Sequence, residues 1–182
     1  MDILTIITPV TRYGNLDAIR RSINIPRENF RWICVFDNTH IPKNIPLDCE
    51  AYVYIDPNSR VGNAQRNFAI ELIKEGHVYF NDDDTTIHHL LWKRIEKLNN
   101  DFIHFSQIHK DGSLRLKGDR ITDNEGGTVD SHNFVVSREC IGDTRWILDR
   151  YDADGVFATV CYKKSVSPIF IPKVLSIYNS LR

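Results

Sequence analysis

Short runs of apolar residues, many of them β-branched or aromatic, recur along the chain and predict buried strands. In the first half of the chain these runs occupy residues 3–8, 31–36, 51–55 and 77–80. Between and after the runs, apolar side chains recur three or four residues apart, which is typical of amphipathic helices. The helices predicted in this way cover residues 15–23, 62–74 and 87–98. This order of elements predicts the beginning of a doubly wound α/β fold with right-handed crossovers.

The second half has shorter apolar runs, separated by turn signals such as Asp111-Gly112. The strands predicted there cover residues 102–106, 114–117, 133–137, 169–171 and 174–177. One further helix is expected to end near residue 161. We interpret the elements over residues 102–137 as a small antiparallel extension of the same sheet, and the last two runs as short closing strands. The expected fold is therefore a single α/β domain over residues 1–182, with a mixed, mostly parallel central sheet flanked by helices.

Composition narrows the class of protein. A chain of 182 residues suits one domain with its own core. Charged residues make up 26% and the formal net charge is −1, which does not indicate a nucleic-acid or membrane surface. The sequence predicts no transmembrane segment and does not begin like a signal peptide. The scattered cysteines form no CxxC pair, so we expect free thiols, buried at Cys34 and Cys161, and a cytoplasmic location.

The fourth apolar run leads directly into three consecutive carboxylates, Asp82, Asp83 and Asp84. Ligands of open α/β sheets gather at the carboxyl ends of the strands. Adjacent carboxylates repel one another, and a divalent cation such as Mg²⁺ or Mn²⁺ would remove that repulsion while also binding substrate phosphates. The triple therefore predicts a metal–diphosphate site. The structural alternative is a solvated acidic turn in which Asp84 or Thr85 caps the next helix.

Other polar residues are expected at the same edge of the sheet. The loop after the first strand covers residues 9–14. Asp37 follows the second strand, where its carboxylate could accept hydrogen bonds from a base or ribose, or form a plain Asx-turn. Arg60 and Arg66 lie just before and within the second helix, where a guanidinium could bind phosphate or pair with the acidic residues. Together these loops predict a nucleotide site.

Two more carboxylates, Asp152 and Asp154, are predicted at the start of the helix that ends near residue 161. Either side chain could cap the helix. Either could also act as a general base, because a helix N-terminus favours the ionised carboxylate. Trp146 lies in a polar neighbourhood, where its ring could stack on a sugar or pack into the core.

Three segments carry a resemblance to a known family. They are TPVTR at residues 8–12 with the run that ends at Asp37, QRN at residues 65–67 with the strand that ends in DDD, and VDSHNFVV at residues 129–136. Together they resemble glycosyltransferases of the GT-A fold, most closely the β-1,3-glucuronyltransferase family (glycosyltransferase family 43) and more loosely inverting family 2. The resemblance implies a Rossmann-like nucleotide-diphospho-sugar transferase fold. Residues 1–105 would form the nucleotide-sugar-binding half, and residues 106–182 the acceptor-binding half.

The resemblance also implies roles for individual residues. Asp84, with Asp82, would ligate Mn²⁺ or Mg²⁺, and Asp130 would contact the acceptor. We add Trp146 to the acceptor side on the strength of its aromatic ring alone. The general base would be Asp152 or Asp154, with the DAD pattern favouring the first. The residues implied on the donor side are Thr8, Pro9, Thr11, Arg12, Asp37, Arg60, Arg66, Asp82 and Asp83. The family's histidine near the diphosphate, after the final strand, has no counterpart at residues 177–179.

The activity implied is metal-dependent, inverting transfer of a sugar from a nucleoside-diphosphate sugar to a hydroxyl of a glycan or glycoconjugate, with a UDP-sugar favoured. One alternative is a sugar nucleotidyltransferase, but the loop at residues 9–14 lacks the glycine-rich, basic sequence usual there. A second alternative is a non-catalytic module that binds a nucleotide or glycan. The intact acidic triple, with an acidic pair downstream, argues against that module.

Overall fold

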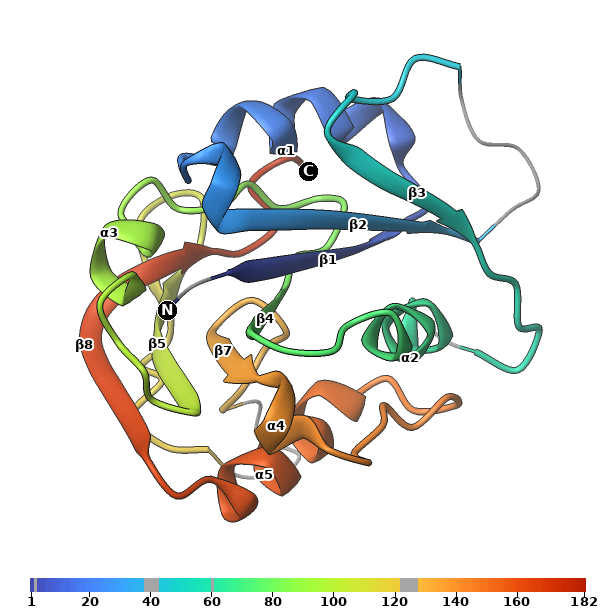
Figure 1. Ribbon diagram of the computed structural model, residues 1–182. Coiled ribbons are helices and arrows are strands. Elements are labelled where there is room, and N and C mark those ends of the chain that lie inside the picture. Colours follow the sequence, from blue (N-terminus) through green and yellow to red (C-terminus); the bar gives the residue numbers. More distant parts are fainter. Residues whose placement is uncertain (2, 38–42, 60, 122–127) are drawn as a thin grey trace.

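The computed structural model describes residues 1, 3–37, 43–59, 61–121 and 128–182. These residues form one eight-stranded sheet with helices on both faces (Figure 1). The strand order is β3-β2-β1-β4-β7-β5-β6, and β8 pairs with β5 outside this path. The strands are β1 (Leu4–Val10), β2 (Phe30–Phe36), β3 (Cys49–Val53), β4 (His77–Phe80), β5 (Phe102–Ile108), β6 (Leu114–Leu116), β7 (Phe134–Ser137) and β8 (Pro168–Ile177).

The first four strands are parallel, with β1 between β2 and β4, and β3 beside β2. Their carboxyl ends therefore share one edge of the sheet, as the doubly wound pattern predicts. In the second half, β7 is antiparallel to β4 and β5, and β6 is antiparallel to β5. These pairings form the expected antiparallel extension, and the closing strand β8 runs parallel to β5. The chain reaches β8 through α5 (Ala153–Lys164), and a helical crossover permits a parallel return.

Helices cover both faces of the sheet. The others are α1 (Leu16–Ser22), α2 (Asn63–Glu71), α3 (Leu91–Ile95) and α4 (Arg138–Ile141), with 3-10 turns at Tyr13–Asn15 and Arg27–Asn29. On one face α1 and α3 pack on residues such as Ile6 and Trp32, and on the other α2, α4 and α5 pack on residues such as Ile7 and Val78 (Figure 1). Burial on both faces explains why the parallel strands read as continuous apolar runs.

Two elements differ from the sequence prediction. The helix predicted over residues 87–98 is limited to α3. Of the apolar side chains expected on its buried face, Leu91 and Ile95 are buried, whereas Leu90 and Leu98 are only partly buried. The Ile87 amide donates to the Ser22 hydroxyl at 2.9 Å, which fixes this segment outside the helix. The two predicted closing strands form the single strand β8, whose register shifts between the partners of Phe105 and Ser106. Pro172 lies at this shift and has no amide proton to donate to the ladder.

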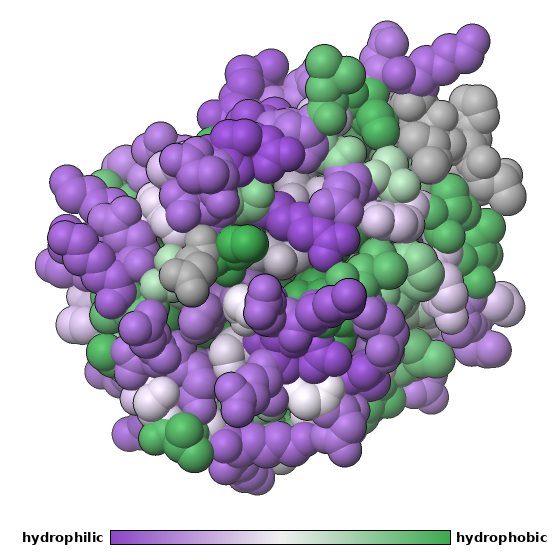
Figure 2. All heavy atoms as spheres, in the orientation of Figure 1, coloured by the Kyte–Doolittle hydropathy of each residue, from purple (hydrophilic) through white to green (hydrophobic). Residues whose placement is uncertain are grey.

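The surface on the face drawn in Figure 2 is mostly hydrophilic, and apolar residues gather near the end of β3 and the segment leading to α2. The exposed apolar side chains of that segment are Val53, Tyr54, Ile55 and Val61. Inside the protein, the thiols of Cys34 and Cys161 are buried, and all four cysteines are free, as predicted. None of the helices in the described ranges has the length and apolar composition needed to cross a bilayer.

Candidate functional site

The carboxyl edge of the parallel strands opens into a cleft of about 730 Å³. Residues before β7, at the start of α5 and after β8 complete its walls. The predicted site residues that line it are Pro9, Thr11, Arg12, Asp37, Arg66, Asp82, Asp83, Asp84, Asp130, Trp146, Asp152 and Asp154. Thr8 does not line the cleft, and Arg60 lies outside the described residues.

Asp83 ties the acidic turn to the loop after β1. Its Oδ2 atom accepts hydrogen bonds from the amides of Thr11 and Arg12, at 2.6 and 2.5 Å, and from the Thr11 hydroxyl at 2.9 Å. Its Oδ1 atom lies 2.7 Å from Nη1 of Arg12. The Asn15 side chain, at the N-terminal end of α1, donates to the Asp83 carbonyl at 2.9 Å. Asp83 therefore shapes the loop and has little capacity left for a ligand.

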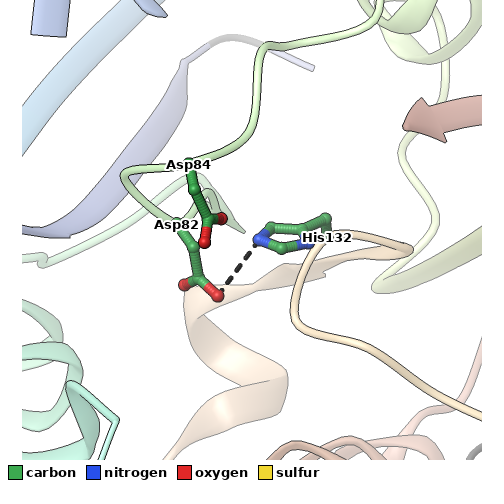
Figure 3. A group of neighbouring side chains, drawn as sticks. All are labelled: Asp82, Asp84 and His132. Atoms are coloured by element: carbon green, nitrogen blue, oxygen red, sulfur yellow. Dashed lines mark ion pairs between the residues drawn. The ribbon is translucent and has the colours of Figure 1, made fainter. Parts of the chain in front are cut away.

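Asp82 and Asp84 lie side by side at the end of β4, with the imidazole of His132 facing them (Figure 3). One ligand atom from each of these three residues lies within 4.8 Å of the others. Asp82 pairs with Arg66, and Asp84 lies 2.6 Å from Nη2 of Arg182. Two carboxylates and one imidazole are a donor set that suits a divalent cation such as Mn²⁺ when the imidazole is neutral, because a protonated ring nitrogen cannot ligate a metal.

Sequence reasoning missed His132. Strand β7 pairs antiparallel with β4, and Tyr79 lies opposite Val135. Continuing that register by three residues on each strand would place His132 opposite Asp82. The available signal was thus a histidine shortly before β7, the strand that pairs with the acid-ended strand β4. Using this signal required knowing that the two strands pair.

The buried charges around His132 hold one another in the ionised state. Burial alone lowers the pKa of His132, but Asp130 and Asp82, at 2.6 and 3.2 Å from its ring nitrogens, raise that pKa to about 10. Burial raises the pKa of Asp82, yet Arg66 and His132 outweigh this and hold it well below its usual range. Asp130 also lies 2.8 Å from Arg115, so both of its oxygens contact cations of the protein.

Asp152 and Asp154 differ sharply in environment. The Asp152 side chain is 44% exposed and pairs with Arg150, whose Nε donates to its Oδ1 at 2.9 Å, and this hydrogen bonding lowers its pKa. Asp154 is more enclosed, and burial, followed by the nearby charge of Asp130, raises its pKa to about 6. Of the two carboxylates, only Asp154 therefore has an affinity for protons matched to general-base chemistry near neutral pH.

Trp146 belongs mainly to the core. Its side chain is almost fully buried and stacks on Phe157, with ring centroids 4.8 Å apart. The guanidinium of Arg66 lies 4.6 Å from the centroid of the indole ring. Trp146 thus supports the arginine that pairs with Asp82 and presents only a small surface to the cleft.

Thr8 has a clear structural role. Its hydroxyl is buried and accepts a hydrogen bond from Nε1 of Trp32 at 3.0 Å.

Thr8→Val should lower the free energy of unfolding by about 1–3 kcal/mol, because the buried indole N–H loses its partner. Urea unfolding measures this change, and nucleotide affinity should stay the same. The matched control is Thr5→Val, on the same strand and also buried. A large loss of nucleotide affinity in Thr8→Val would contradict this role.

Known protein-family models give no match to this chain, and curated proteins give none either. Solved structures do match. The structure of S. aureus TarS 1-349 has a TM-score of 0.77 and 13% identity, over 96% of this chain and 60% of that chain. TarS 1-349 in complex with UDP-GlcNAc gives a TM-score of 0.71 at 13% identity, over 96% and 58%. The mannosyltransferase PcManGT from Pyrobaculum calidifontis, in complex with GDP-Man and Mn²⁺, gives 0.64 at 12% identity, over 97% and 56%.

These likenesses show that the protein has the α/β fold of GT-A glycosyltransferases, as the sequence resemblance implied. The chain spans about 60% of the length of the TarS structure it matches. None of the three structures carries the name of the β-1,3-glucuronyltransferase family, so that narrower assignment stays a prediction.

Proposed function

We propose that this cleft binds a nucleoside-diphosphate sugar and that the protein transfers the sugar, with inversion, to a hydroxyl of a glycan or glycoconjugate. The observation that carries the proposal is the convergence of Asp82, Asp84 and His132 on one point at the carboxyl edge of a GT-A sheet. Structures similar to this one hold UDP-GlcNAc, or GDP-Man with Mn²⁺. We favour a UDP-sugar as the donor, and a relationship to glycosyltransferase family 43.

The donor set of Asp82, Asp84 and His132 fits Mn²⁺ or Mg²⁺, because two carboxylates supply hard oxygen ligands and their separation is small. Binding of the ion would displace the proton from Nε2 of His132, which faces Asp82, while Nδ1 stays paired with Asp130. When bound, the ion would offset the negative charge that develops on the departing nucleoside diphosphate. Arg12 and Arg66, on the loop after β1 and on α2, bring positive charge to the same end of the cleft.

On the donor side, Asp37 at the end of β2 would accept hydrogen bonds from the base, and the loop held by Asp83 would lie beside the phosphates. On the acceptor side, Asp154 would remove the proton from the attacking hydroxyl. Its raised pKa of about 6 and its place in the cleft favour it over Asp152. Asp130 and Trp146 would help to form the acceptor wall, mostly through the residues they hold in place.

Calorimetric titration of UDP and of GDP, each with and without Mn²⁺, tests the proposal directly. One of the two nucleotides should bind with Mn²⁺ and bind weakly without it. Asp84→Ala should weaken the Mn²⁺-dependent binding by about tenfold or more, because a ligand of the ion is lost.

Asp48→Ala is the matched control, since Asp48 also pairs with an arginine, Arg20, but lies outside the cleft. It should leave nucleotide binding unchanged. Failure of wild-type protein to bind either nucleotide would overturn the proposal and favour a module without catalytic activity.

A further inference from the structure

Asn63, at the first position of α2, uses its whole side-chain amide in contacts within the protein. The side chain is buried, and Nδ2 donates to the carbonyls of Ile147 and Arg150 at 2.8 and 2.9 Å. Its Oδ1 atom accepts from Nη1 of Arg66 at 3.2 Å. The amide therefore joins the arginine of the donor side to the segment that precedes α5.

That segment depends on such contacts. Residues 142–152 connect α4 to α5 without a helix or strand, so no backbone ladder fixes their path. Their end delivers Asp154, which lies four residues beyond the Arg150 carbonyl held by Asn63. Asn67, one turn further along α2, makes a pair of hydrogen bonds with the backbone of Trp146, at 2.8 and 2.9 Å.

On the other side of Asn63, Arg66 extends the connection to the acidic turn. Its Nη2 atom pairs with Asp82, while its Nη1 atom also donates to the carbonyl of Val61 at 2.7 Å. A continuous path of short polar contacts thus runs from Asp82 through Arg66 and Asn63 to the segment that precedes α5. This path links the two halves of the cleft from the side of α2, while the pairing of His132 with Asp82 links them from the side of β7.

We propose that Asn63 is a positioning residue that sets where Asp154 stands relative to Asp82, and so aligns the acceptor hydroxyl with the sugar donor. The inference rests on the proposed function. Asn63 would act through Arg66 and the loop carbonyls, without contacting the substrate. A reacting group misplaced by about 1 Å can cost roughly 10²-fold in rate.

Asn63→Ala should therefore lower kcat for hydrolysis of the bound nucleotide sugar by about 10- to 100-fold. The dissociation constant of the Mn²⁺–nucleotide complex, measured by calorimetry, should change less than about threefold, because the groups that bind the nucleotide remain. The matched control is Asn100→Ala. The Asn100 amide also bridges two segments, donating to the Ser167 carbonyl at 2.9 Å, but it lies outside the cleft. That variant should leave both quantities unchanged.

Hydrogen exchange of the backbone amides of residues 147–155 gives a second readout that needs no turnover. These amides should exchange faster in Asn63→Ala than in the wild type, and at the wild-type rate in Asn100→Ala. Unchanged exchange in Asn63→Ala, or a loss of nucleotide affinity as large as the loss of kcat, would overturn the inference.

If Asn63→Ala does not fold, Asn67→Ala loosens the same loop while keeping the contact between Asn63 and Arg66, and the same split between kcat and affinity is expected. Equal losses of both quantities in Asn67→Ala would count against the inference. Absence of donor turnover in wild-type protein would instead refute the proposed function, and the exchange experiment would still decide whether Asn63 holds the loop.

Discussion

Asp154→Asn should lower kcat for hydrolysis of the nucleotide sugar by about 10²–10⁴-fold, the range typical for loss of a general base. Water takes the place of the acceptor in this reaction, so no acceptor has to be known. The amide of asparagine has nearly the shape of the carboxyl group but cannot accept the proton. Binding of the Mn²⁺–nucleotide complex should be retained, since Asp154 acts on the attacking hydroxyl. Release of nucleoside diphosphate over time measures the rate.

The matched control is Asp152→Asn, because Asp152 is two residues away and also lines the cleft. Its pKa is lowered by Arg150, whereas burial raises the pKa of Asp154 to about 6. Asp152→Asn should change kcat little. An effect of Asp152→Asn as large as that of Asp154→Asn would contradict the assignment of the base.

The pH dependence follows with a definite sign. Below a pH of about 6 the Asp154 carboxyl is protonated and cannot accept a proton, so kcat/KM should be low. The value should rise with pH through about 6 and then level off. Asp154→Asn should remove this rise, which a merely misplaced loop would not do.

Arg66→Met should lower the free energy of unfolding by about 3 kcal/mol. Removing one partner of a buried ion pair typically costs roughly 3–5 kcal/mol, and we expect a value near the lower end of that range. The Arg66 side chain is only 4% exposed and the Asp82 side chain 32%, so the lower end of the range applies. The loss of Arg66 leaves the Asp82 carboxylate with His132 as its remaining cationic partner. Methionine keeps apolar contact with the Trp146 ring, so the change isolates the charge. Urea unfolding at constant pH measures the difference.

Arg20→Met is the control for a surface ion pair. Arg20 pairs with Asp48 at 2.5 Å, with its side chain 36% exposed, and its replacement should cost about 0–1 kcal/mol. Adding Asp82→Asn to Arg66→Met should restore part of the lost stability, because the uncompensated charge is removed with it. Equal costs for Arg66→Met and Arg20→Met would show that the Asp82 carboxylate is well solvated without its partner.

Local sequence patterns were sufficient for the first half of the fold. Strands β1, β2 and β4 and helices α1 and α2 were predicted close to their observed bounds, because a parallel sheet covered on both faces needs continuous apolar runs. Residues at the carboxyl ends of these strands necessarily meet at one edge, so Asp37 and the acidic triple could be placed together from sequence alone. The direction of β8 could not be predicted in this way, since pairing between distant strands leaves little trace in local periodicity.

The sequence by itself determined the class of sheet, the edge at which the cleft forms and the residue types that gather there. Only the tertiary structure decided which of them face a ligand. Thr8 points into the core, and the Asp83 carboxylate is hydrogen-bonded to the loop after β1. His132 lies beside Asp82 because β7 pairs antiparallel with β4. Likewise, burial separates Asp154 from Asp152, two neighbours that the sequence could not rank. The physical reason is that side-chain direction, burial and pairing arise from contacts between segments far apart in the chain, whereas sequence patterns report only local periodicity.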